Sequence, residues 1–119
     1  MTALDRRGPV LMFALIRATA VLLAVLVLGH FAVTHLVTDV SATNSSFVVR
    51  RWSSALWIAW DLTMLVAALV HASCGMWLVI AEQAPAASRR RRQLSIAAIS
   101  TVLLAIGTAA IVVGAARGA

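Results

Sequence analysis

The sequence contains no lysine and no tyrosine, and it has one cysteine, Cys74. A single cysteine excludes a disulfide bond within the chain. Because lysine is absent, all ten positive charges are arginines, and the net charge is +6. A strongly basic chain can bind nucleic acid. Here most of the arginines lie outside the long apolar runs, which indicates a role in membrane orientation and argues against a nucleic-acid partner.

Apolar residues are abundant: they make up 62% of the 119 residues, and the mean hydropathy is +0.97. About 20 consecutive apolar residues suffice to cross a bilayer as a helix. The sequence therefore predicts an all-α integral membrane protein whose three transmembrane helices pack as an antiparallel bundle. We expect one membrane-anchor domain, 1–119, with spans at about 10–37, 54–82 and 94–116 and polar loops at 38–46 and 83–92.

The distribution of arginine predicts the orientation. The first apolar run is much longer than the core of a signal peptide, so we expect it to be retained as a span. The N-terminal tail and the second loop share one side and carry most of the charge outside the membrane, at Arg6, Arg7 and Arg89–Arg92. Loops rich in arginine stay in the cytoplasm. We therefore expect a multi-pass protein of the inner (plasma) membrane with a cytoplasmic N-terminus.

His71 lies near the middle of the second predicted span. A titratable side chain at this depth is costly and marks a candidate functional site. Small residues flank it on one helix face, at Ala67, Ala68, Cys74 and Gly75. A flat porphyrin could lie on such a face with His71 as its axial ligand. Two alternatives stay open at this point, a hydrogen bond to a neighbouring helix and a role in proton transfer.

Three polar residues lie toward the predicted cytoplasmic edge. Arg17 is two turns into the first span, where it can either reach the lipid headgroups or pair with an anion such as a haem propionate. Glu82 and Gln83 end the second span at the same level. They are either ordinary polar residues of the membrane interface or residues that border a small-molecule site.

Further polar residues lie toward the opposite edge. His30 could ligate a second haem or could be a hydrogen-bonded interfacial histidine, and we expect His35 to contact solvent. Asp61 follows two tryptophans near the start of the second span. Because a charge inside the membrane is costly, we expect Asp61 to pair with Arg50 or Arg51, or with a partner chain.

Three segments resemble a known family, the small D-type hydrophobic membrane anchors of succinate dehydrogenase. LIRATAVLLAVLVLGH, residues 15–30, resembles the first span of these anchors. LVHASCGMWLVIAE, residues 69–82, is similar to their second span, with the recurrent pattern H-x-x-x-G-M-x-x-x-x-x-[DE]. RRWSSALWIAWDL, residues 50–62, looks like the actinobacterial members.

The resemblance implies a membrane anchor that binds haem b between itself and a second hydrophobic anchor, of the C type. His71 would be one axial ligand of the haem iron, Arg17 would lie close to the propionates, and His30 would suit a second haem. Succinate would be oxidised on a flavoprotein subunit, and electrons would pass through an iron–sulfur subunit to quinone. This chain would be a non-catalytic subunit of that enzyme, in contact with membrane lipid.

The sequence departs from the family at the quinone site. Many members have Asp-Tyr at the end of the second span, and the tyrosine donates a hydrogen bond to quinone. Here those positions are Glu82 and Gln83. The amide of Gln83 can donate a hydrogen bond, but it cannot act as a phenolic acid.

Two other functions remain as alternatives. One is a structural anchor of a respiratory complex that holds no cofactor. The other is a small transporter of the multidrug type, which would need a carboxylate in its first span and a fourth span. The first predicted span of this chain has no carboxylate.

Overall fold

The computed structural model describes residues 3–118, with side chains from residue 8 onward, and this part of the chain is all-helical. Three helices are long and apolar enough to cross a membrane. The elements are α1 (Ala3–Phe31), the π-helical turn η1 (Ala32–Val37), the 3₁₀ turn η2 (Val40–Ala42), α2 (Ser45–Arg51), α3 (Ala55–Gln83) and α4 (Ala86–Gly118). The prediction of an all-α, three-span fold is therefore confirmed, and the chain has the form of a multi-pass membrane protein.

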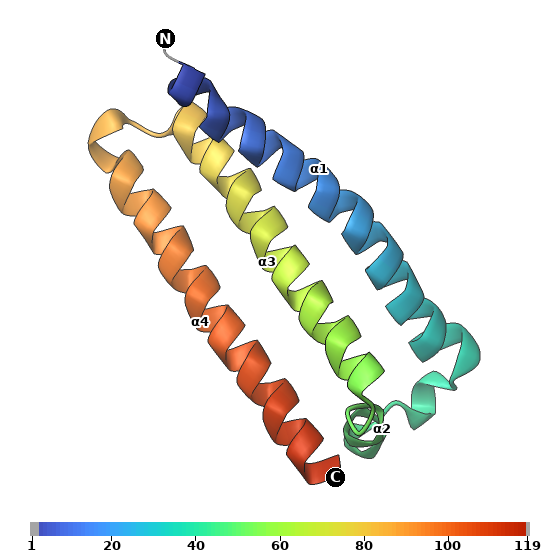
Figure 1. Cartoon of the computed structure of the whole chain (residues 1–119). Coiled ribbons are helices and arrows are strands. Elements are labelled where there is room, and N and C mark those ends of the chain that lie inside the picture. Colours follow the sequence, from blue (N-terminus) through green and yellow to red (C-terminus); the bar gives the residue numbers. More distant parts are fainter. Residues whose placement is uncertain (1–2, 119) are drawn as a thin grey trace.

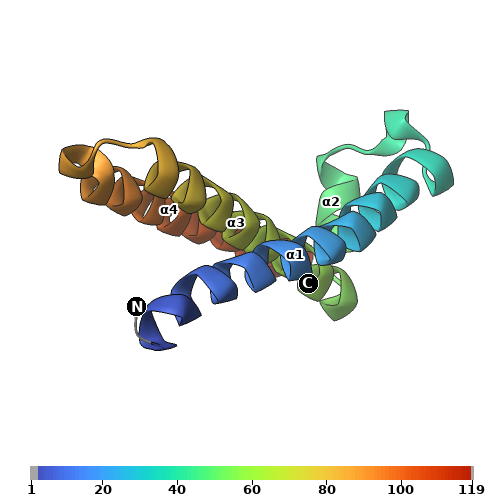
Figure 2. The same ribbon diagram turned by 90° about the horizontal axis from the view of Figure 1, so that it is seen from above.

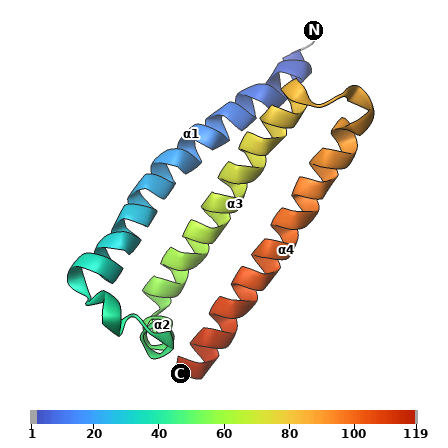
Figure 3. The same cartoon turned by 180° about the vertical axis from the view of Figure 1, so that it is seen from behind.

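Helix α3 lies between α1 and α4 and runs antiparallel to both (Figure 1 and, from behind, Figure 3). Seen from above in Figure 2, α1 crosses α3 at an open angle, whereas α4 runs alongside α3. The molecule measures 54 × 24 × 24 Å. The short helix α2 and the C-terminus lie at one end, which we call the α2 end. The N-terminus and the connection from α3 to α4 lie at the other, the α3–α4 end.

Little of the apolar surface is buried within the chain. Among the described side chains, the buried apolar residues are Leu26, Ala67, Ile80, Ala84 and Ile111. Large apolar side chains on all three long helices are instead exposed, for example Val21 (69%) and Ile106 (61%). Exposed apolar surface on this scale is unfavourable in water and marks surface for lipid or partner helices.

Close contacts hold the helices together at a few points. The Trp60 indole lies against Gly29, and Trp60 Nε1 donates a hydrogen bond to the Leu26 carbonyl of α1 (3.3 Å). Between α3 and α4, the Ser73 and Ser100 hydroxyls are hydrogen-bonded at 2.7 Å. Small residues and hydroxyl pairs at contacts of this kind are typical of helix packing in membranes.

The predicted loop after the first span is partly helical. Asn44 caps α2 by accepting a hydrogen bond from the Phe47 N–H (3.1 Å). Trp52, which ends α2, packs against Gly114 of α4. Asp39 caps η2, and hydrogen bonds from the backbone and side chain of Ser41 lower the pKa of its carboxyl group.

The prediction of a loop at 83–92 is wrong. Helix α4 begins at Ala86, so Arg89–Arg92 are helical and only Ala84 and Pro85 connect α3 to α4. The Pro85 carbonyl accepts hydrogen bonds from the N–H groups of Ser88 (3.0 Å) and Arg89 (3.1 Å), which form the first turn. Arginine has a high helix propensity, so a run of arginines readily extends an apolar helix beyond the membrane.

Candidate functional site

His71 lies in the middle of α3 and is hydrogen-bonded to α1. Its Nδ1 is 3.0 Å from Thr19 Oγ1, and Thr19 is buried in the interface between the two helices. Thr19 Oγ1 is also 2.6 Å from the Leu15 carbonyl, one turn earlier on α1. The imidazole is therefore held in place by a neighbouring helix of the same chain.

This network favours one tautomer of a neutral imidazole. A hydroxyl has one proton, and at 2.6 Å the Thr19 proton is donated to the Leu15 carbonyl. Thr19 Oγ1 then accepts from His71, so Nδ1 of His71 carries the proton. Nε2 is left with a lone pair. A histidine that ligates a metal has the same arrangement, because its other ring N–H is donated to an oxygen acceptor that fixes the tautomer.

The small residues around His71 differ in what covers them. Ala67 is buried and lies beside α1, and Cys74 lies beside Ser100 in a groove between α3 and α4, so these two positions do not belong to an open surface. Ala68 and Ala72 are exposed, and a Cβ on Gly75 would meet nothing within 4 Å. Successive positions in a helix are about 100° apart. The open face beside His71 therefore consists of Ala68, Ala72 and Gly75.

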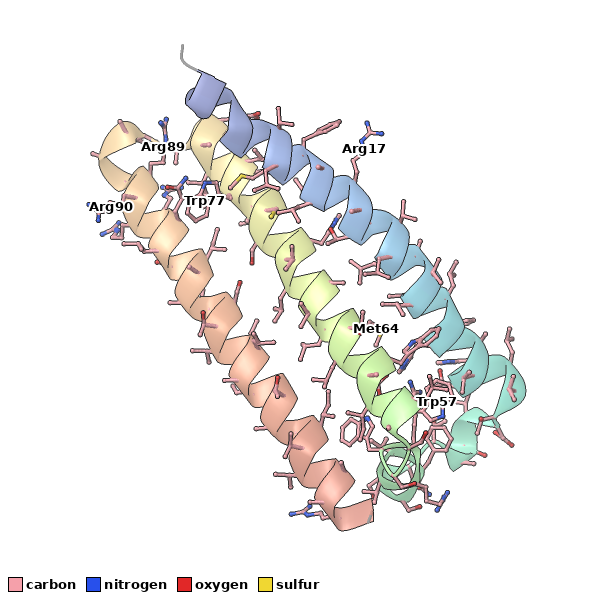
Figure 4. All side chains as sticks on the ribbon, viewed as in Figure 1. Arg17, Trp57, Met64, Trp77, Arg89 and Arg90 are labelled. Atoms are coloured by element: carbon pink, nitrogen blue, oxygen red, sulfur yellow. The ribbon has the colours of Figure 1, made fainter. Side chains whose placement is uncertain are left out.

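The structure does not bring Arg17 to His71. Arg17 is exposed, and its guanidinium lies 4.8 Å from the centre of the Phe13 ring. Figure 4 shows Arg17 projecting away from α3. Because Thr19 faces α3, Arg17 lies on the opposite side of α1, where its side chain can extend along the helix toward the membrane edge.

Glu82 and Gln83 end α3 and are both exposed. Eleven positions correspond to about three helical turns, so Glu82 lies on the same face of α3 as His71. The axial separation is about 16 Å. The open face beside His71 thus continues to a carboxylate at the α3–α4 end.

A buried ion pair lies at the α2 end. Arg51 Nη2 donates a hydrogen bond to Asp61 Oδ1 at 2.7 Å, and Trp52 Nε1 donates to Asp61 Oδ2 at 2.8 Å. The Arg51 guanidinium also lies 4.2 Å from the centre of the Trp57 ring. The predicted pairing of Asp61 is therefore confirmed, with Arg51 as the partner.

His30 contacts this ion pair. Its Nδ1 is 3.2 Å from Arg51 Nη2 and 3.7 Å from Asp61 Oδ1. Arginine can only donate, so Nδ1 of neutral His30 is an acceptor and its proton lies on Nε2. This tautomer is opposite to that of His71 and leaves no lone pair on Nε2 for a metal. The geometry therefore favours a hydrogen-bonded interfacial histidine over a ligand of a second haem.

His35 lies on the π-helical turn η1, which follows α1. His35 and His30 both line a cavity of about 360 Å³, together with Arg51 and Asp61. His35 stacks on Phe31 with ring centres 4.4 Å apart, and its side chain is exposed, as expected.

No protein-family model and no curated protein matches the chain. The sequence predicted the pairing of Asp61 and indicated His71 as a candidate, but it did not indicate Thr19 or Trp52 as their partners. A threonine inside an apolar helix is common. The sequence does not indicate how α1 is rotated about its axis, and this rotation turns Thr19 toward His71.

Proposed function

We propose that this chain is a membrane-anchor subunit of a succinate:quinone oxidoreductase and that it binds haem b through His71. Succinate oxidation would take place on a flavoprotein subunit, and an iron–sulfur subunit would carry electrons to the membrane. A second hydrophobic anchor would supply the other axial ligand. The succinate dehydrogenase resemblance of residues 15–30, 50–62 and 69–82 supports this assignment.

The observation that carries the proposal is the hydrogen bond between Thr19 and His71. With the Thr19 proton donated to the Leu15 carbonyl, this bond would keep the proton of a neutral His71 on Nδ1 and leave Nε2 free, in the middle of α3. The residues present fit a haem, because Ala68, Ala72 and Gly75 leave an open face of α3 beside His71. A porphyrin needs a flat, apolar surface next to its ligand, and larger side chains at these positions would block it.

In this proposal each residue of the site has a separate role. Thr19 would accept a hydrogen bond from Nδ1–H and orient the ring, and Nε2 of His71 would hold the haem iron. When bound, the haem supplies a one-electron carrier. Glu82 and Gln83, at the α3–α4 end of the same helix, would border the quinone site and offer a carboxylate and an amide for hydrogen bonds. Arg17 lies on the side of α1 that faces away from His71, so its contact with the propionates remains a prediction.

A structural anchor without cofactor is the second candidate, and the same hydrogen bond supports it. A histidine that donates to Thr19 links α1 to α3, as polar residues do in membrane helix packing. In that case His71 would need no iron. A transporter of the multidrug type is less well supported, because Asp61, the carboxylate closest to mid-membrane, is engaged by Arg51 and Trp52.

Purification of the chain from its native membrane, through an affinity tag, tests the proposal. We expect a flavoprotein, an iron–sulfur protein and a second hydrophobic anchor to copurify, with succinate-dependent reduction of a quinone. A complex that contains these subunits but no b-type haem would support the structural anchor. A chain that purifies without a flavoprotein would contradict the proposal.

A further inference from the structure

Four consecutive arginines, Arg89–Arg92, form the first turns of α4, and all four side chains are exposed. Four successive helical positions are spread over about 300° around the axis. The arginines therefore surround the end of α4 instead of forming a stripe along one side. Figure 4 shows Arg89 and Arg90 at the α3–α4 end, close to the level of Trp77 on α3.

The chain offers this cluster little negative charge. Glu82 is the sole acidic side chain in the sequence from residue 62 to residue 119. The ion pairs found among the side chains of residues 8–118 involve Asp61, at the α2 end. Among the side chains of residues 8–118, no ion pair involves Arg89–Arg92, and Arg89 Nη2 donates a hydrogen bond to the Ala84 carbonyl at 3.4 Å. These arginines can therefore bind an anion from outside the chain.

The chemistry of the cluster selects phosphate as that anion. A membrane-orientation signal needs only positive charge, which lysine supplies equally well, yet every positive charge here is arginine. The planar guanidinium donates two parallel hydrogen bonds to a phosphate, whereas the lysine ammonium acts as a point charge. Tryptophan is enriched near the membrane interface, and Trp77 lies toward this end of α3.

We infer that Arg89–Arg92 bind the phosphate groups of anionic phospholipids around the start of α4. A flat acidic protein surface could reach only the arginines on one side of the helix, whereas lipid headgroups can reach every side that α3 does not cover. This lipid contact requires only that α3 and α4 cross the membrane, and it is independent of the proposed haem and quinone chemistry.

Lipid retention in nanodiscs tests this inference. The full chain, in its native complex, is placed in nanodiscs of phosphatidylglycerol and phosphatidylcholine in equal amounts, and the lipids that stay bound are identified by native mass spectrometry. Both leaflets have the same composition, so a variant that inserts upside down still meets both lipids. Each basic residue near an anionic surface strengthens binding by about fivefold. We therefore expect phosphatidylglycerol to be retained at least about tenfold over phosphatidylcholine.

Three variants identify the source of that preference. We expect R89Q/R90Q/R91Q/R92Q to lose most of it, while R50Q/R117Q, which removes exposed arginines at the α2 end, keeps it. The matching change of all four arginines to lysine should keep the charge and give an intermediate preference. Equal retention of both lipids by the unaltered chain would overturn the inference, as would an unchanged preference in the glutamine variant. Loss of an acidic subunit from the glutamine variant, with its lipid preference intact, would assign the cluster to a protein contact and also overturn it.

Discussion

Arg51 Nη2 and Asp61 Oδ1 are 2.7 Å apart and join α2 to α3 at one end of the bundle. Their side chains are 6% and 12% exposed. Trp52 Nε1 donates a hydrogen bond to the second carboxylate oxygen of Asp61, and His30 of α1 contacts Arg51. The Asp61 carboxylate thus links α3 to α2 and, through Arg51, to α1. The helices bury few apolar side chains around this contact.

Asp61→Asn should destabilise the fold markedly. The substitution leaves the Arg51 charge buried without its partner, and breaking a buried ion pair costs about 3–5 kcal/mol. The free energy of unfolding, measured by titration with a denaturing detergent, should fall by an amount in this range. Asp39→Asn, at an exposed position, is the control and should change it by less than about 0.5 kcal/mol. Equal stability of the two variants would show that the ion pair contributes nothing.

Gly29→Ala should loosen the contact between α1 and α3. A Cβ at Gly29 would lie 2.7 Å from Trp60 Cζ2, so the indole must move. Overpacking of this kind costs about 1–3 kcal/mol. Gly75→Ala is the matched control, because a Cβ there meets nothing within 4 Å. The same unfolding titration should separate the two alanine variants, and a stable Gly29→Ala variant would contradict the packing.

The three spans could be predicted from the sequence because a bilayer demands long apolar helices. The pairing of Asp61 could also be predicted, since a lone carboxylate in an apolar segment needs a cation and Arg50 and Arg51 are the nearest candidates in the sequence. The helical state of Arg89–Arg92 could not, because hydropathy shows where a segment leaves the membrane and not where its helix ends.

The surroundings of His71 could be predicted only in part. Spacing places Ala67, Ala68, Cys74 and Gly75 within about one turn of His71, but it does not say which neighbour covers each side of α3. Ala67 is buried beside α1, and the packing of α3 on α4 places Cys74 in the groove beside Ser100. For the same reason, the sequence does not say which side of α1 faces α3, so it could not predict that Arg17 lies on the opposite side.

Gly75→Leu should remove haem without unfolding the chain. The space at Gly75 is open in the isolated chain, so a leucine side chain meets no atom of α1 or α4 at its Cβ. It would, however, occupy the face on which the porphyrin is proposed to lie. The haem content of the purified complex should fall several-fold. Met76→Leu, at the next and exposed position, is the control and should keep its haem.

Thr19→Val should weaken haem binding through His71 without removing the ligand. Valine has nearly the shape of threonine but cannot accept a hydrogen bond from Nδ1–H. The orientation and tautomer of the ring are then no longer held by α1. Loss of such a partner lowers metal affinity by about 10–100-fold. Thr19→Ser keeps the hydroxyl and should retain the haem, which can be checked by titrating haem into the apo-complex. Equal affinities of the two variants would show that the hydroxyl does not position the ligand.

The most direct test of haem ligation by His71 is the reduced-minus-oxidised absorption spectrum of the assembled complex with and without His71→Ala. We predict a b-type haem band in the unaltered complex, its loss in His71→Ala and its retention in His35→Ala. A band that persists in the His71→Ala complex, or that is absent from the unaltered one, would contradict haem ligation by this chain.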